Sequence, residues 1–265
     1  GAFEKRLALR YHGHQFQVYN PELGDGRGFL FAQLEDDRGR LLDLGTKGSG
    51  RTPWSRGGDG RLTLKGGVRE VLATSMLEAL GVDTSKSLSL IETGEELERG
   101  DEPSPTRSSV LVRLSHGHIR IGSFQRLSYF KDDEKLSRLL DYSVRTYMPE
   151  LWLEGDNRRA AAFLGTVAER VAETGARWIA AGFVHGVLNT DNINVTGESF
   201  DYGPWRFLPH YDPAFTAAYF DETGLYAFGR QPEAIHWNCV QLAASLLRIA
   251  DEAALRAALD RFGPL

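Results

Sequence analysis

The sequence predicts an α+β protein with a strand-rich first half and a helical second half. Between residues 15 and 44, apolar and polar residues alternate and are interrupted by Gly and Asp, as is typical of antiparallel strands joined by turns. After Tyr129 the apolar residues recur at helical spacing instead. With 265 residues, the chain can bury a sizeable core and form one large domain or two lobes.

Composition and charge are those of a globular protein. The net charge of -5 gives no reason to expect a nucleic-acid or membrane partner, and no apolar run has the length of a bilayer span. Cys239 is the only cysteine, so no internal disulfide can form, and its neighbours favour a buried, unreactive thiol. We expect a cytoplasmic protein in a bacterium or a mitochondrial one in a eukaryote, and we expect the chain to be truncated at both ends.

A glycine-rich turn lies among the N-terminal strands and reads Gly24-Asp25-Gly26-Arg27-Gly28. Glycines let a backbone fold tightly against phosphate oxygens, and an arginine adds a fixed positive charge. The same residues also fit a plain hairpin turn, for which Asp-Gly is a strong signal. Taken alone, the turn is the better interpretation.

A basic run begins at Lys47, where the next predicted strand ends. Between Lys47 and Arg69 one carboxylate, Asp59, faces six cations separated by glycines, namely Lys47, Arg51, Arg56, Arg61, Lys65 and Arg69. Such runs are usually solvated faces, but the glycine spacing favours a flexible loop that wraps a polyphosphate. The run contains no G-x-x-x-x-G-K-[ST] motif, which disfavours a P-loop NTPase.

The segment from Val68 to Leu80 has the spacing of an amphipathic helix, ended by Gly81. Glu70 lies in its early part. A lysine at a strand end followed by a helical glutamate parallels the pair that orients the lysine of protein kinases toward the nucleotide phosphates. The plainer alternative is that Glu70 is an exposed helix residue.

Further strands and one exposed polar loop are predicted before Tyr129; the strands are 87–91, 109–114 and 118–124, and the loop is 92–107. Arg113 and Arg120 stand on the latter two strands. Arginines on the interior face of a sheet need anionic partners. A phosphate ligand is therefore one interpretation of this pair, and surface exposure is the other.

The stretch 185–203 sets three asparagines and two aspartates between short apolar pieces, as expected of a loop, strand and loop that holds a metal. It partly matches the H-R-D-x-x-x-x-N and D-F-G motifs of protein kinases, with His185, Asn192 and Asp201 at the corresponding positions. Val187 stands where the catalytic aspartate would be, so Asp191 is the carboxylate left to act as a base. These oxygens suit Mg²⁺; alternatively, Asn and Asp gather here because loops favour them.

The chain order of these features predicts a bilobal protein-kinase-like fold. An N-lobe at 1–128 would carry the glycine loop, Lys47 and the helix of Glu70, and a mainly helical C-lobe at 129–265 would carry the metal-binding loop. The nucleotide would lie in the cleft between the lobes. Helices of the second half are expected at 131–151, 157–183, 232–249 and 251–262.

Several stretches together resemble the selenoprotein O family of protein adenylyltransferases, which have a pseudokinase fold. They are LGDGRG from Leu23, KGSGRTPWSRGGDGR from Lys47, VREVLATSMLEALGV from Val68, VRLSHGHIRIGSF from Val112, HGVLNTDN from His185 and DYGPW from Asp201. The resemblance covers nearly the whole chain. It implies that ATP binds inverted relative to ordinary kinases and that AMP is transferred to a Ser, Thr or Tyr hydroxyl of a protein substrate, with release of pyrophosphate.

The resemblance also implies residue roles. Asp191 would accept the proton, and Asn192 and Asp201 would hold Mg²⁺, with Mn²⁺ as an alternative. The ATP site would be lined by Gly24, Gly26, Arg27, Lys47, Asp59, Gly60, Glu70, Arg113, Arg120 and Asp201. The family's C-terminal selenocysteine or cysteine is not in this chain, and Cys239 does not lie at that position, so redox control at that tail is not carried over.

Two other functions stay open at this point. One is a kinase that transfers the γ-phosphate of ATP, which the mass of the protein adduct would distinguish from AMP transfer. The other is a catalytically silent pseudokinase that binds nucleotide as a scaffold. A silent scaffold would not need the full set of site residues that the sequence retains, namely Lys47, Glu70, Asp191, Asn192 and Asp201.

Overall fold

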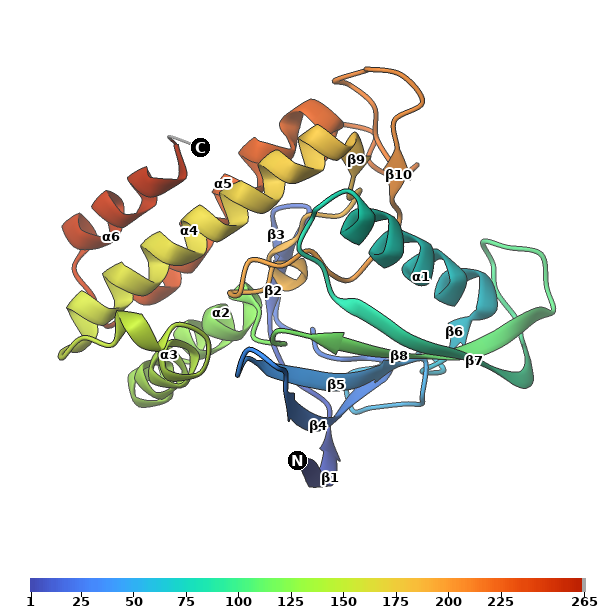
Figure 1. Ribbon diagram of the computed structural model, residues 1–265, viewed down its shortest axis with the longest axis horizontal. Helices are drawn as coiled ribbons and strands as arrows, with labels where there is room; N and C mark the ends of the chain where they lie inside the picture. Colours follow the sequence, from blue (N-terminus) through green and yellow to red (C-terminus); the bar gives the residue numbers. More distant parts are fainter. Residues whose placement is uncertain (264–265) are drawn as a thin grey trace.

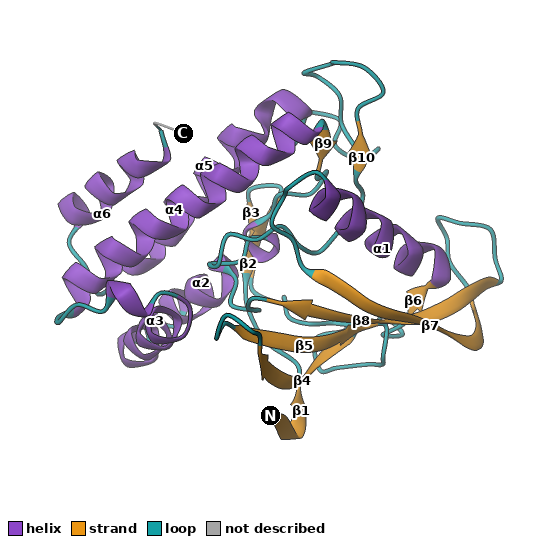
Figure 2. Cartoon of the chain, viewed as in Figure 1, coloured by secondary structure: helices purple, strands orange, loops and turns teal. Residues whose placement is uncertain are grey.

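The computed structural model describes residues 1–263 and has an antiparallel sheet followed by a helical part, as Figures 1 and 2 show. This confirms the predicted α+β class with strands mainly in the first half. The sheet strands are β1 (Ala2–Leu7), β4 (Gly28–Glu35), β5 (Leu41–Lys47), β6 (Leu62–Thr63), β7 (Lys86–Leu97) and β8 (Thr106–Ser115). Among residues 1–263, no helix is long and apolar enough to cross a bilayer.

The order of the sheet places Lys47 next to the glycine loop. The strands of the described chain run β1-β4-β5-β8-β6, with β7 also paired to β8, and every pairing is antiparallel. Strand β5 is therefore central. Its last residue, Lys47, lies opposite Gly28 of β4 on one side and opposite Leu111 of β8 on the other.

Two small two-stranded sheets lie outside this sheet. Strand β2 (Gly13–Gln15) pairs with β3 (Val18–Asn20), and β9 (Phe183–Val184) pairs with β10 (Arg206–Phe207). The predicted strand around Phe16 is thus interrupted, because Phe16 lies in the turn between β2 and β3.

Helix α1 (Leu64–Ala79) begins four residues before the predicted start at Val68, with Thr63 as its N-cap. The Thr63 hydroxyl accepts a hydrogen bond from the Gly66 N–H over 3.0 Å, which is a strong helix start. Gly67 allows the helix to approach β7 closely, since a Cβ there would lie 2.5 Å from Leu90 Cδ1.

The buried face of α1 differs from the one that its apolar residues indicate. Glu70 faces inward and is 2 % exposed, so the interpretation of Glu70 as an exposed helix residue is wrong. Leu77 is buried and Val71 is half-buried, but four apolar residues of the stripe stay at the surface, namely Val68, Leu72, Met76 and Leu80. Glu70 faces inward because it pairs with Lys47. The spacing of apolar residues along the helix gives no indication of this ion pair.

Two predictions in the region 86–130 are wrong. The segment His118 to Phe124 is not a strand, because Arg120 precedes helix α2 (Ile121–Tyr129). Half of the expected polar loop 92–107 is strand, since β7 and β8 extend to leave only residues 98–105 between them. Most of the distal part of β7 is exposed, so its residues do not alternate between apolar and polar. Its pairing with β8 therefore has no signal in the sequence.

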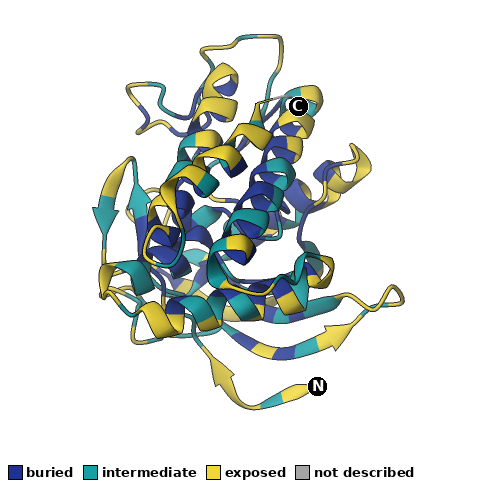
Figure 3. Ribbon diagram, turned by 90° about the vertical axis from the view of Figure 1, so that its left-hand side faces the viewer, coloured by how far each residue is buried: buried dark blue, intermediate teal, exposed yellow. Residues whose placement is uncertain are grey.

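The helical part consists of α3 (Asp133–Tyr147), α4 (Asp156–Ala181), α5 (Gln231–Leu246) and α6 (Glu252–Leu259), with short 3₁₀ turns at Pro149–Leu151, Thr190–Asn192, Phe228–Arg230 and Asp260–Phe262. Helix α4 packs against α5 and α6, and buried residues gather on the inner sides of the helices (Figure 3). Cys239 of α5 is fully buried, and burial raises the pKa of its thiol to about 12, as expected of an unreactive cysteine.

Candidate active site

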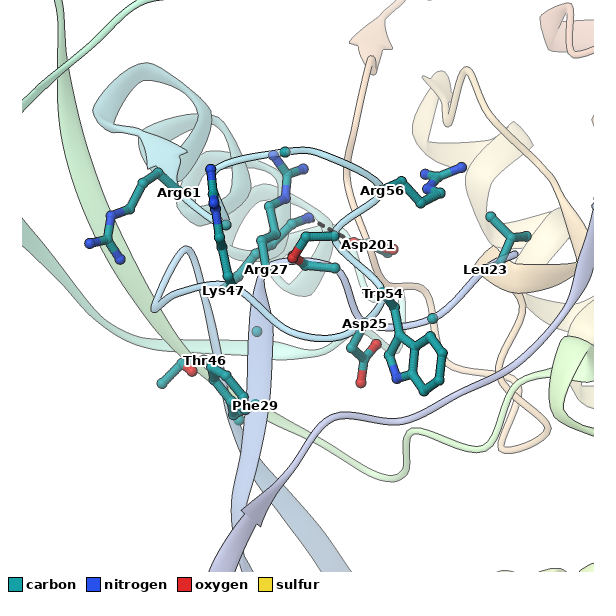
Figure 4. A pocket seen from close by; sticks show the side chains of 18 of the residues that line it. Leu23, Asp25, Arg27, Phe29, Thr46, Lys47, Trp54, Arg56, Arg61 and Asp201 are labelled. Atoms are coloured by element: carbon teal, nitrogen blue, oxygen red, sulfur yellow. Dashed lines mark hydrogen bonds and ion pairs between the residues drawn. The ribbon is translucent and has the colours of Figure 1, made fainter. Parts of the chain in front are cut away.

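A pocket of about 590 Å³ opens where the glycine loop, the end of β5 and the stretch 185–203 meet (Figure 4). Within the described chain, eight cations and four aspartates line it, so the pocket favours an anionic ligand. They are Arg27, Lys47, Arg51, Arg56, Arg61, Arg99, Arg113, Arg120, Asp25, Asp59, Asp191 and Asp201.

The structure brings most of the predicted site residues to this one pocket. Those that line it are Gly24, Gly26, Arg27, Lys47, Asp59, Gly60, Arg113, Arg120, Asp191 and Asp201. Glu70 lies behind Lys47 and reaches the site through it. Asn192 is different, because it borders a separate small cavity together with Val171 and Thr174.

The basic run after Lys47 is folded onto the glycine loop by hydrogen bonds. The hydroxyl of Thr52 donates to the Asp25 carbonyl over 2.6 Å, and the hydroxyl of Ser55 donates to the Gly26 carbonyl over 2.5 Å. The loop closes on itself where the Gly50 N–H donates to the Gly60 carbonyl over 3.1 Å. Three arginines of the run are thereby held around the pocket, namely Arg51 and, as Figure 4 shows, Arg56 and Arg61.

Close approach explains two of the glycines in these loops. A Cβ at Gly24 would lie 2.5 Å from Cγ of Trp54, so the indole can cover the glycine loop only if residue 24 lacks a side chain. A Cβ at Gly60, where φ is +74°, would lie 2.3 Å from the backbone of Gly50.

Lys47 lies between two carboxylates at the base of the pocket. Its Nζ donates to Glu70 Oε1 and, over 2.7 Å, to Asp201 Oδ1. Arg113 approaches the same two carboxylates at 3.9 Å from Glu70 Oε2 and 3.7 Å from Asp201 Oδ1. Burial alone would raise the pKa of Asp201, but Lys47, Arg113 and Arg120 hold it well below its usual range.

Arg113 itself has unused hydrogen-bonding capacity. Its Nε and Nη1 groups are buried and have no hydrogen-bond partner among residues 1–263. Buried N–H groups of this kind are costly unless a ligand satisfies them. Both predicted interior arginines are in fact buried, Arg113 to 7 % and Arg120 to 1 % exposure, so the interpretation that they lie at the surface is wrong.

Arg120 is held by one carboxylate and two aromatic rings. Its Nη1 donates to Asp25 Oδ1 over 2.9 Å, and its guanidinium carbon lies 4.2 Å from the ring centre of Tyr11 and 5.2 Å from that of Phe200. The other Asp25 oxygen accepts the Leu9 N–H over 3.1 Å. The glycine loop is thus tied through Asp25 to a buried cation that also lines the pocket.

Asp191 lies in the 3₁₀ turn Thr190–Asn192 and is 9 % exposed. Its Oδ1 is buried and accepts no hydrogen bond from the part of the chain that the structure describes. Burial raises the pKa of Asp191 to about 6, although Arg120 acts in the opposite direction. A carboxylate with a raised pKa and a free oxygen on the wall of a pocket is suited to accept a proton.

A sequence profile described as protein adenylyltransferase SelO matches residues 2–265 of this chain. The chain belongs to the SelO family. Two similar relatives are both called protein nucleotidyltransferase YdiU. The one from Synechocystis sp. is 57% identical over 257 residues (97% of this chain and 54% of the relative), and the one from Synechococcus elongatus is 56% identical over 266 residues (99% and 54%).

More distant SelO relatives align over a similar range. The protein nucleotidyltransferase YdiU of Azotobacter vinelandii is 43% identical over 258 residues, which is 97% of this chain and 52% of the relative. The chain therefore spans about half the length of the curated relatives it matches.

An adenylyltransferase of the SelO family uses ATP and generally a divalent cation, and the carboxylates of this pocket, with Asn192 beside Asp191 in the sequence, fit such an ion. The Asp201 carboxylate is ionised, and only its Oδ1 is engaged by cations among residues 1–263. Asp191 lines the same pocket, and its Oδ1 accepts no hydrogen bond within the described chain. The Asn192 Nδ2 donates to the Val187 carbonyl over 3.1 Å, which leaves the amide oxygen of Asn192 for a ligand.

Sequence reasoning assigned no role to several residues of the SelO pocket. Tyr11 and Trp54 form walls of the pocket, and Asp25 anchors Arg120. Arg99 comes from the connection after β7 and pairs with Asp59 over 2.8 Å. Asp25 was visible within the glycine motif, but nothing in the local pattern around Tyr11 or Arg99 signals a site, because each reaches the pocket only through the fold.

Proposed function

We propose that this chain is the nucleotide-binding and catalytic part of a protein adenylyltransferase. It would transfer AMP from ATP to a Ser, Thr or Tyr hydroxyl of a protein substrate and release pyrophosphate. The observation that carries this proposal is that Asp191, whose buried Oδ1 accepts no hydrogen bond within residues 1–263, lines the same pocket as Lys47 and the unsatisfied Arg113. Membership of the SelO family and the names of its relatives support the same reaction.

The proposed arrangement is that of a bilobal kinase-like fold. Residues 1–128 would form the N-lobe, with the sheet, the glycine loop and α1, and residues 129–265 the C-lobe. The contact from Lys47 at a strand end to Glu70 on the helix, and on to Asp201, supports this interpretation. Val187 takes the place of the usual kinase base and cannot accept a proton, which favours a reaction that runs through Asp191 instead.

In the proposed reaction the acceptor oxygen attacks the α-phosphorus of ATP. The bond from that phosphorus to the oxygen that bridges to the β-phosphate breaks, pyrophosphate leaves, and the hydroxyl proton passes to Asp191. Lys47, Arg113 and Arg120 would stabilise the negative charge that develops on the phosphates. Glu70 would keep Lys47 in place, and Gly24, Gly26, Arg27, Asp59 and Gly60 would line the rest of the nucleotide.

Asp201 and Asn192 would hold the divalent cation, for which we propose Mg²⁺, with Mn²⁺ as a second candidate. When bound, such an ion neutralises phosphate charge and favours departure of pyrophosphate. The bacterial sources of the reported relatives favour a cytoplasmic enzyme over a mitochondrial one.

The test is to incubate the protein and its Asp191→Asn variant with ATP, Mg²⁺ and a mixture of acceptor proteins. We expect adducts with the mass of AMP, and pyrophosphate in equal amount, from the wild-type protein only. Adducts with the mass of a phosphate group would show a kinase instead. ATP binding without any adduct would show a nucleotide-binding scaffold.

A further inference from the structure

A hairpin from the N-terminal end of the chain holds the loop that carries Asp191. The backbone N–H of His14 in β2 donates to Thr190 Oγ1 over 2.7 Å. The backbone N–H of Phe16, in the turn of the hairpin, donates to Asn189 Oδ1 over 3.0 Å. The two residues just before Asp191 are thus held by a segment 173 to 176 positions away in the sequence.

The Thr190 hydroxyl belongs to a closed ring of three hydrogen bonds. It donates to Gln125 Oε1 of α2 over 2.6 Å, and Gln125 Nε2 donates in turn to His14 Nδ1 over 2.7 Å. Burial lowers the pKa of His14, which favours the neutral ring that an accepting Nδ1 requires. Thr190 is 0 % exposed and Gln125 is 4 % exposed, so water does not compete for these bonds.

The contact between the hairpin and Asp191 is close. A Cβ on Gly13 would lie 3.0 Å from Asp191 Oδ1 and 3.2 Å from Asp191 Cβ. The backbone of β2 therefore forms the surface against which the Asp191 side chain rests. Gly13 does not have a positive φ, so its backbone conformation does not require a glycine. The close approach of Asp191 does.

The turn of the hairpin is fixed in an unusual backbone conformation. Phe16 and Gln17 have φ values of 50° and 63°, which residues other than glycine rarely adopt. Such a conformation persists where surrounding contacts impose it. The Phe16 ring lies 4.9 Å from that of Tyr226, whose hydroxyl donates to Asn189 Oδ1 over 2.7 Å, so the turn and the Asp191 loop share a partner.

We propose that the β2–β3 hairpin positions Asp191 for proton transfer, and that Thr190 is the residue through which His14 and Gln125 act on it. This inference rests on the proposed function, in which Asp191 accepts the proton. Within the described chain, none of His14, Gln125 and Thr190 lines the nucleotide pocket. Their loss therefore affects the rate of transfer and not the affinity for the nucleotide.

The decisive variant is Thr190→Val, which keeps the side-chain shape and removes the hydroxyl. We expect kcat for AMP transfer to fall by about 10- to 100-fold, the effect of misplacing a catalytic group by a fraction of an ångström to one ångström. The KM for ATP and the ATP dissociation constant stay within about threefold of the wild-type values, because the variant removes no contact with bound ATP. Thr190→Ser restores the rate, and Thr166→Val, a half-buried threonine of α4, serves as the matched control.

A second variant leaves the hydrogen bonds in place. Gly13→Ala puts a methyl group against Asp191, so we expect a loss of kcat without a loss of ATP affinity, as for Thr190→Val. It also keeps the inference testable if Thr190→Val does not fold, which circular dichroism would show. Wild-type kcat in both folded variants, or an equal loss in Thr190→Val and Thr190→Ser, would overturn the inference.

Hydrogen–deuterium exchange separates this inference from the proposed function. In Thr190→Val we expect faster exchange in residues 187–193, with unchanged exchange in the central sheet. If the wild-type protein transfers no AMP, the proposed function fails, and the exchange result alone decides whether the hairpin holds the loop. Unchanged exchange in residues 187–193 would refute the hairpin's role whatever the activity.

Discussion

Replacing Glu70 by Gln tests the buried charge cluster at the base of the pocket. Lys47 is 6 % and Glu70 is 2 % exposed, and Lys47 Nζ bonds both Glu70 Oε1 and Asp201 Oδ1. Removing one partner of a buried ion pair costs roughly 3–5 kcal/mol. Because Lys47 keeps Asp201 at 2.7 Å, we expect the lower end, about 3 kcal/mol less free energy of unfolding.

For a chain of this size, a loss of about 3 kcal/mol corresponds to a fall of about 6–10 °C in Tm. We would measure it by urea and thermal unfolding without nucleotide, since a bound anion would compensate the uncovered cation. The control is Glu173→Gln, whose partner Arg177 is exposed; that pair contributes about 0–1 kcal/mol.

A double-mutant cycle with Lys47→Met isolates the pair itself. We expect a coupling energy of about 1–3 kcal/mol between positions 47 and 70. An ordinary surface substitution changes the free energy of unfolding by up to about 0.5 kcal/mol. If the free energy of unfolding of Glu70→Gln lies within that range of the wild-type value, the buried pair does not stabilise the fold and the reasoning is wrong.

Three further predictions concern single carboxylates. Asp191→Ala should abolish AMP transfer yet leave ATP affinity within about threefold, measured by calorimetry; transfer at a near-normal rate would remove Asp191 as the base. Asp201→Ala should weaken binding of Mg-ATP by at least about tenfold, the loss of a charge-assisted contact, and calorimetry showing unchanged affinity would contradict its metal role. Burial raises the pKa of Glu198 to about 8 from its ordinary value of 4.5, so its ionisation destabilises the fold and the free energy of unfolding should fall between about pH 4.5 and pH 8. Urea unfolding at pH 5.5 and 8.5 should show less of this fall in Glu198→Gln, and an identical pH dependence in both proteins would refute the assignment.

The motifs predicted the site better than the elements that carry it. Lys47, Asp191 and Asp201 line one pocket, as predicted. They could be predicted because each stands in a short motif whose residue types indicate its chemistry. Arg120 reached the pocket although its predicted strand is wrong, since what matters is its position just before α2. Asn192 stands beside Asp191 in the sequence but borders another cavity, and its metal role stays a prediction.

The sequence by itself determined the α+β class, the membership of the SelO family and the identity of most charged groups at the pocket, because these depend on local periodicity and on short contiguous motifs. Only the tertiary structure decided that Glu70 turns inward, that Asp25 anchors Arg120, and that the hairpin at Gly13 supports Asp191. Each of these depends on contacts between residues far apart in the chain. A local sequence pattern does not indicate which distant side chain pairs with a buried charge, so that pairing is determined by the packing of the whole chain.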